Sequence, residues 1–220
     1  MGYRKMINVV WFKRDLRVHD NEALTSAAKD GLVLPLYIYE PSLWEQEEMS
    51  STKRAFLRVS LEELNLALKE LGPGLIIKKG NAVDILDNLN KRHGIRGLYS
   101  HQETWNGWTY KRDLEVRRWL KSKGIRWHES RQNGVIRSLK DRNGWAKNWQ
   151  SQMTVPLFKA PQTLDKVGEK TDKIDLSNNK LEHNLETQML AKGGRKEGLS
   201  FLHSFLNIRG ENYTKQMSSP

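Results

Sequence analysis

A cluster of charged side chains directly follows the apolar run Ile7–Phe12: Lys13, Arg14, Asp15 and Arg17. The run predicts a buried strand, and Asp20 predicts the start of a helix as its N-cap. The cluster then lies on a strand-to-helix turn, where open parallel sheets bind their ligands. These groups can hold a polar ligand, or they can serve the turn alone through an arginine–aspartate ion pair and the capping aspartate.

The sequence lacks the residue patterns of several common catalytic and metal-binding sites. Cysteine is absent, which excludes disulfides, thiolate zinc sites and a cysteine nucleophile, and which fits a reducing compartment. The six histidines show no i, i+4 metal-binding spacing, and no serine has the setting of a nucleophile elbow. No phosphate-binding glycine loop follows the first strand. We therefore predict no catalytic residue and no metal ligand.

Five apolar segments with the length of strands alternate with helical patterns. The predicted strands cover residues 7–12, 32–40, 75–79, 96–101 and 125–129, although Pro35 weakens an interior position for the second. The predicted helices cover residues 21–29, a long stretch capped by Ser51 or Thr52, a stretch capped by Asn81, and residues 108–123. This alternation predicts an α/β fold with a doubly wound, five-stranded parallel sheet of the Rossmann-like kind.

Charge and hydropathy limit the partners. The chain has 220 residues and a net charge of +11, and residues 111–147 hold 12 Lys and Arg against 4 Asp and Glu. Such a segment can follow the phosphates of DNA, or it can be a solvated helix face flanked by basic turns. The apolar runs are too short for a transmembrane helix, and the first residues do not resemble a signal peptide. We expect a cytoplasmic protein without a membrane partner.

The character of the chain changes after residue 153. Residues 162–192 are rich in Lys, Asp, Asn and Thr with weak periodicity, which predicts a long surface linker. Leu199, Leu202, Phe205 and Leu206 then predict a terminal amphipathic helix that ends at Arg209. Its apolar face needs a cover, either from this chain or from a partner.

Four stretches resemble one known family. Residues 11–24 are similar to the opening signature of DNA photolyases and cryptochromes, Trp-Phe-(Arg/Lys)-Arg-Asp-Leu-Arg-x-x-Asp-Asn-x-Ala-Leu. Residues 52–64 resemble a helix of that family, and residues 100–113 resemble the loop after its fourth strand. Residues 193–213 resemble the entry to its flavin domain. The likeness is closest to the branch of bacterial class III photolyases and plant-like cryptochromes.

The resemblance implies a domain organisation. Residues 1–150 correspond to the α/β antenna-chromophore domain, residues 151–192 to the interdomain linker, and residues 193–220 to the first helix leading into the FAD-binding helical domain. The Ser-x-Leu-Ser-Pro motif that holds the flavin phosphates in this family is missing from the chain. We therefore expect light-driven DNA repair or blue-light sensing only together with a flavin domain, in cis or as a separate chain. DNA is then a further expected partner, and the chain alone is expected to be inactive.

The resemblance also implies cofactor-binding residues. An antenna chromophore, either the pterin methenyltetrahydrofolate or a deazaflavin, is expected near the ends of the first, second and fourth strands. The matching positions are Lys13, Arg14, Asp15, Tyr37, Arg54, Glu103, Asn106 and Trp108, and Tyr213 matches a tyrosine that contacts FAD. The acidic residue of some folate-binding members falls at Thr109, which leaves the antenna's identity open. Trp105 stands where related loops carry glycine.

Each of these positions also has a structural interpretation. The charged residues can serve the turn, Tyr37 can be a core residue, Arg54 can pair with an acid on its helix, Glu103 and Asn106 can cap a helix, and Trp108 can pack. Two other functions remain open as well: a free-standing nucleotide-binding α/β module, and a basic DNA-binding accessory protein without photochemistry. A bound near-ultraviolet or blue chromophore would favour the photolyase interpretation over both.

Overall fold

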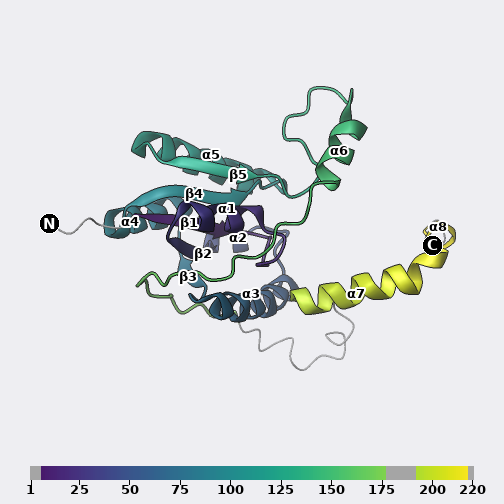
Figure 1. The fold of residues 1–220 in the computed structure, drawn as a ribbon, viewed down its shortest axis with the longest axis horizontal. Helices are drawn as coiled ribbons and strands as arrows, with labels where there is room; N and C mark the ends of the chain where they lie inside the picture. The colour runs from purple at the N-terminus through teal and green to yellow at the C-terminus, as the bar shows by residue number, and fades with distance from the viewer. Residues whose placement is uncertain (1–5, 177–191, 218–220) are drawn as a thin grey trace.

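A five-stranded parallel sheet forms the centre of the computed structural model, which describes residues 6–176 and 192–217 (Figure 1). The strands run in the spatial order β3-β2-β1-β4-β5, and every neighbouring pair is parallel. Their bounds are β1 Ile7–Phe12, β2 Val33–Tyr39, β3 Ile76–Lys79, β4 Ile95–His101 and β5 Arg126–Ser130. The predicted doubly wound α/β fold is confirmed, with every strand bound within one residue of its prediction.

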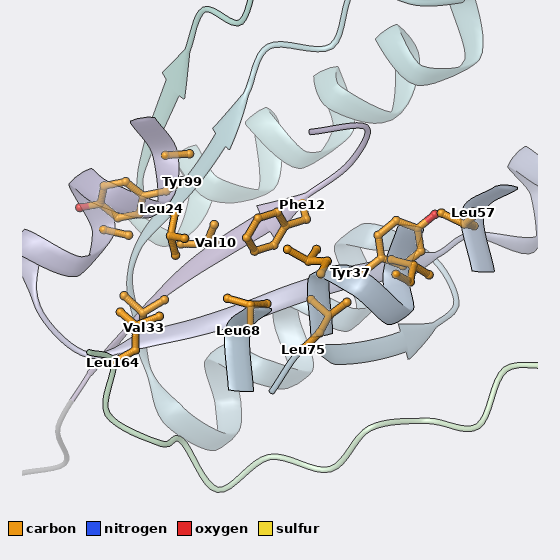
Figure 2. Packing of buried hydrophobic residues seen from close by; sticks show 14 of the residues in the cluster. Val10, Phe12, Leu24, Val33, Tyr37, Leu57, Leu68, Leu75, Tyr99 and Leu164 are labelled. Atoms are coloured by element: carbon orange, nitrogen blue, oxygen red, sulfur yellow. The ribbon is translucent and has the colours of Figure 1, made fainter. Parts of the chain in front are cut away.

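Helices cover both faces of the sheet, as right-handed crossovers require. They are α1 Glu22–Asp30, α2 Pro41–Trp44, α3 Ser51–Leu71, α4 Ala82–His93 and α5 Gly107–Lys123. Along β1, Val10 and Phe12 belong to the core with α1 and α3, which Figure 2 shows from close by. Val9 and Trp11 belong to the opposite core with α4 and α5. The continuous burial of β1 follows from this two-sided packing.

Two local predictions were wrong. Asn21, rather than Asp20, caps α1: its side chain accepts a hydrogen bond from Leu24 N at 2.9 Å. Asp20 adopts a positive φ of 52° and exchanges hydrogen bonds with the backbone of Phe158 instead. The cap of α3 is Ser50, one residue before the predicted Ser51 or Thr52.

Pro35 lies inside β2 although that strand has a neighbour on each side. It pairs with Val10 of β1, whereas β3 joins β2 only from Leu36 onward. Pro35 therefore stands where β2 is still an edge on the β3 side, and proline is tolerated at such an edge.

Helix α6 Trp145–Met153 crosses the predicted start of the linker at residue 151, and the described residues after it, up to Leu176, form an extended segment (Figure 1). Leu164 N donates to Leu71 O at 2.7 Å, and Asp172 N donates to Ile77 O at 2.8 Å. Leu164 and Leu176 are buried in the core that contains α3. The segment thus covers the exposed edge of β3, which would otherwise present unpaired backbone groups.

Glu169 binds this segment to the rest of the domain, and its ionisation makes the stability of the fold depend on pH. Its carboxylate lies 2.8 Å from Lys78 Nζ, 3.0 Å from Arg92 Nη1 and 2.8 Å from His93 Nε2. Burial alone raises the pKa of Glu169, but the hydrogen bonds from Lys78 and His93 outweigh it and lower the pKa to about 2. Because its pKa is lower in the folded protein, the ionised Glu169 stabilises the fold fully at pH values above its unfolded pKa near 4.5. This stabilisation is lost as the pH falls toward 2.

Glu169→Gln should therefore lower the free energy of unfolding by about 1–2 kcal/mol at pH 7 and by less than half of that at pH 3. Urea unfolding followed by circular dichroism at both pH values measures the difference. Glu62→Gln, which removes an exposed carboxylate paired with Arg58, is the control and should have little effect at either pH. An equal cost of Glu169→Gln at pH 7 and pH 3 would contradict the pKa shift.

Gly72, at the end of α3, lets the backbone of the same segment pack closely at Leu164. Its φ is +134°, and a Cβ at this position would lie 2.2 Å from the carbonyl oxygen of Leu164. We expect Gly72→Ala to destabilise the protein by more than about 2 kcal/mol, because both the backbone strain and the clash oppose it. Gly168→Ala, where a Cβ meets open space, is the matched control in thermal unfolding. Equal melting temperatures for the two variants would show that the segment does not pack as described.

The predicted terminal helix is confirmed as α7 Arg195–Asn207, followed by a 3-10 turn, η2 Arg209–Asn212, and by α8 Tyr213–Gln216. Its start is tied to α3, since Gly194 N donates to Ser60 Oγ at 3.0 Å. From there α7 projects away from the sheet (Figure 1), and Leu199, Phe201 and Leu202 are about half exposed. Among the described residues, no helix has the length and apolarity needed to cross a bilayer.

Candidate functional site

A cavity of about 320 Å³ opens at the carboxyl ends of β1, β2 and β4. The strand order reverses at β1, whose two neighbours are β2 and β4, so this position is the topological switch point where open α/β sheets bind ligands. Its walls come from the β1–α1 turn, the end of β2 with α2, the first turns of α3, and the β4–α5 loop with the start of α5.

Aromatic and apolar side chains form most of the lining. Tyr37 and Trp44 are buried, and Trp44 stacks on Tyr39 with ring centroids 5.7 Å apart and planes at 12°. Trp105 lies on the β4–α5 loop, with the guanidinium of Arg14 at 5.3 Å and Lys53 Nζ at 5.6 Å from its ring centroid. Flat, partly enclosed apolar walls with a few charged groups suit a conjugated ring.

Arg112 organises the charged side of the cavity. Its Nη1 lies 2.8 Å from Glu40 Oε2, its Nη2 lies 2.8 Å from Asp113 Oδ1, and its Nη2 lies 4.0 Å from Glu103 Oε2. The guanidinium also lies over the ring of Trp11, 4.7 Å from its centroid. Burial lowers the pKa of Arg112, but the carboxylates of Glu40 and Asp113 outweigh burial and raise it. The group is therefore a permanent buried cation.

Lys13 is the second buried cation of the site. Its Nζ lies 3.4 Å from Asp113 Oδ2 and 4.9 Å from the centroid of the Trp11 ring. Burial lowers the pKa of Lys13, and the charge of Asp113 opposes that shift. Arg137 completes the network from the loop after β5, with Nη2 at 3.2 Å from Asp113 Oδ2.

Asp15 holds the turn between β1 and α1. Its Oδ1 accepts a hydrogen bond from Lys13 N at 2.9 Å, and its Oδ2 lies 2.5 Å from His101 Nδ1. Burial raises the pKa of Asp15, but the hydrogen bond with His101 outweighs burial and lowers it. Asp15 lines a polar hollow of about 260 Å³ that shares Lys13, Arg14 and Glu103 with the main cavity. Its contacts are those of a turn-stabilising residue.

Two buried polar atoms of the cavity lining lack a hydrogen-bond partner among the described residues: Glu40 Oε1 and Trp44 Nε1. Glu40 is 3% exposed and Trp44 is 7% exposed, so bulk water does not compensate either group. Unpaired buried polar groups are costly and rare in folded proteins.

The structure brings together four of the nine predicted cofactor-binding residues on the cavity lining: Lys13, Arg14, Tyr37 and Glu103. Arg14 Nη2 and Glu103 Oε1 form an ion pair at 2.8 Å. Burial raises the pKa of the Tyr37 hydroxyl.

The other five predicted residues lie off this lining. Asp15 lines the polar hollow, Arg54 donates from Nη2 to Trp44 O at 3.5 Å, and Asn106 caps α5 by accepting from Thr109 N at 3.0 Å. The Trp108 ring centroid lies 5.8 Å from the Arg112 guanidinium. Tyr213 is not part of the lining: it lies in α8, which Figure 1 shows beyond the end of α7. Its ring meets that of Phe205 edge-on, with the ring centroids 5.4 Å apart.

Sequence reasoning missed Glu40, Leu43, Trp44, Lys53 and Arg112. The short helix α2 supplies Leu43 and Trp44, and its only sequence signal was Pro41 at the first helical position. Arg112 lies in the basic segment after residue 110, where a charged side chain is usually solvated, so its burial could not be read from the pattern.

A profile described as DNA photolyase matches residues 8–143. The chain is 34% identical over 122 residues to a deoxyribodipyrimidine photo-lyase of Salmonella typhimurium, covering 52% of this chain and 25% of that protein. It is 37% identical over 101 residues to the blue-light photoreceptor PHR2 of Arabidopsis thaliana, covering 43% of this chain and 23% of that protein. The chain therefore spans about a quarter of the length of these curated relatives.

The solved structure of a bacterial class III photolyase from Agrobacterium tumefaciens superposes with a TM-score of 0.76 at 22% identity. The superposition covers 94% of this chain and 46% of that one. At this level of identity the likeness concerns the fold, and it places this sheet and its helices in the same architecture.

Proposed function

The chain belongs to the DNA photolyase family, and on that premise we propose that residues 1–150 form a light-harvesting antenna domain that holds a chromophore in the cavity beside β1, β2 and β4. The observation that carries the proposal is the cavity itself. It lies at the switch point of the sheet, it is lined largely by aromatic and apolar side chains, and two buried polar atoms of its lining have no partner in the part of the chain described.

The residues of the cavity have distinct proposed roles. Trp44 and Trp105 offer flat faces to a conjugated ring, and Tyr37 contributes a buried wall. Arg112 fixes the carboxylates of Glu40 and Asp113 in place, so that the polar groups are ordered before a ligand arrives. When bound, an antenna chromophore supplies absorption in the near ultraviolet or blue and passes the excitation energy to a flavin.

The activity of a whole photolyase or cryptochrome is a proposal for this chain. We propose that it acts with an FAD-binding helical domain, in cis or as a separate chain, in light-driven DNA repair or in blue-light sensing. Residues 151–192 then connect the two domains and residues 193–220 begin the second. In the same proposal DNA is a partner of the assembled protein and the location is cytoplasmic.

The basic segment over residues 111–147 gives the competing DNA-binding function less support. Four of its cations are engaged in ion pairs within the domain: Arg112, Arg117, Lys123 and Arg137. Arg112 is also buried and thus out of reach of a phosphate backbone. A free-standing nucleotide-binding module would use the same cavity, so only the nature of the occupant separates it from the antenna proposal.

The test is the absorption spectrum of the 220-residue chain, purified in the dark and then titrated with methenyltetrahydrofolate, 8-hydroxy-5-deazaflavin, riboflavin and ATP. The proposal expects binding of at least one light-absorbing ring with a dissociation constant in the micromolar range or below, seen as a shifted band and induced circular dichroism. Binding of ATP alone would favour the nucleotide module, and salt-sensitive binding of DNA without any chromophore would favour the accessory protein.

A further inference from the structure

Trp105 lies at the solvent side of the cavity beside β1, β2 and β4. Three of the residues that line this cavity are exposed and therefore mark its opening: Arg14, Lys53 and Phe56. The ring of Trp105 contacts the first two, with the guanidinium of Arg14 5.3 Å and Lys53 Nζ 5.6 Å from its centroid. We infer that Trp105 is a gate, a side chain that closes this opening and swings out to admit and release the occupant.

The two cations that Trp105 contacts belong to different walls of the cavity. Arg14 lies on the β1–α1 turn, and Lys53 lies in the first turn of α3. Each cation also has a partner of its own: Arg14 Nη2 pairs with Glu103 Oε1 at 2.8 Å, and Lys53 Nζ donates to Glu48 O. The two groups that receive the indole are therefore held by contacts that do not depend on Trp105, and the ring joins one wall to the other.

Trp105 itself is held weakly. It lies on the β4–α5 loop, it is only partly buried, and its indole nitrogen makes no hydrogen bond within the described part of the chain. Cation–π contacts at exposed positions are weak, and the cost of breaking two of them corresponds to a factor of about 5–30 in an equilibrium constant. The closed position is therefore the more populated one, and the open position remains accessible.

A gate has a kinetic consequence that a fixed wall lacks. It slows entry and exit by the same factor, so it retains an occupant for longer without changing its affinity. Long retention suits an antenna, because a bound chromophore absorbs light repeatedly without being consumed. The gate rests on the antenna proposal for the nature of its occupant, whereas its closure follows from the contacts of Trp105 with Arg14 and Lys53 alone.

The experiment uses the absence of cysteine from the chain, because a single introduced thiol then reports access to the cavity. Leu57 lines the cavity from α3 and is 8% exposed, so Leu57→Cys places the thiol inside. Its rate of reaction with the neutral aromatic disulfide dithiodipyridine measures the entry of a flat ring. In this background, Trp105→Leu should speed the reaction about 5- to 30-fold. Trp105→Tyr, which keeps an aromatic face for the two cations, should change it by less than about 3-fold.

Lys53→Met separates a gate from a fixed wall. Methionine keeps most of the length of the side chain and removes its charge, so the indole loses one of its two cations and the reaction should be about 2- to 5-fold faster. Lys69→Met, at an exposed lysine near the other end of α3, is the matched control and should leave the rate unchanged. A thiol at the 61% exposed position of Leu66 should react at one rate in every background, and thermal unfolding confirms that each variant is folded.

Two results would overturn the gate. The first is an unchanged reaction rate of the cavity thiol in a folded Trp105→Leu variant. The second is acceleration by Trp105→Leu without any acceleration by Lys53→Met, because the indole would then be a fixed wall. No chromophore takes part in this measurement, so the gate and the antenna proposal fail separately: a cavity that opens as expected but binds no light-absorbing ring would contradict the antenna proposal alone.

Discussion

We expect Arg112→Met to lower the free energy of unfolding by about 3–5 kcal/mol, because it removes the cation that buried carboxylates share. The side chain is 6% exposed, and its guanidinium contacts the carboxylates of Glu40 and Asp113 at 2.8 Å, with Glu103 at 4.0 Å. Methionine fills much of the same volume but leaves these buried carboxylates without their shared cation. Urea unfolding of the 220-residue chain, followed by circular dichroism, measures the loss.

Arg118→Met is the control for this prediction, because Arg118 is an exposed arginine on the same helix, α5. Its replacement should change the free energy of unfolding by less than about 0.5 kcal/mol. The double variant Arg112→Met with Glu40→Leu should recover part of the loss, since removal of a complete buried pair is far less costly than removal of one partner. A cost below 1 kcal/mol for Arg112→Met alone would show that the network does not organise the site.

Leu43→Trp should abolish binding of the chromophore, with affinity lowered more than about 100-fold, while the fold persists. Leu43 lies on α2, lines the cavity and is only partly buried, so a larger side chain there can extend into the cavity without displacing the core. Isothermal or fluorescence titration with the chromophore that binds the wild-type chain measures the effect.

Leu66→Trp is the matched control for the filled cavity, because Leu66 is 61% exposed on α3. It adds the same side chain at a surface position and should leave the affinity unchanged. Unaltered binding by a folded Leu43→Trp variant would mean that the ligand occupies a different part of the molecule.

The architecture was predictable because its signals are local and strong. Each strand is a short apolar run bounded by turn residues, and a glycine, a common residue at helix ends, is the C-cap of α3, α4 and α5 (Gly72, Gly94 and Gly124). The prediction of Asp20 as the N-cap of α1 was wrong because aspartate and asparagine are both good N-caps. The choice of Asn21 is fixed by the contact of Asp20 with Phe158, which lies 138 residues away.

The site was predictable only in part, because some of its residues follow strands directly and others reach it through tertiary packing. Lys13, Arg14, Tyr37 and Glu103 stand at strand ends, so topology brings them to one edge of the sheet. Trp44 and Lys53 reach the same cavity from α2 and α3 through tertiary packing that leaves no periodic trace. The burial of Arg112 depends on carboxylates from three segments, which a linear pattern does not reveal. Asp15, in contrast, was placed correctly on the turn, and its contacts match the structural interpretation.

The central claim is that the cavity beside β1, β2 and β4 holds a light-absorbing ring, and a crystal structure of the chain grown with the ring that binds it in titration tests it most directly. The account predicts electron density for a flat conjugated ring inside this cavity, among Tyr37, Trp44 and Trp105. Density for the ring in the polar hollow beside His101 or on the outer surface, with the cavity itself empty of ligand, would contradict it.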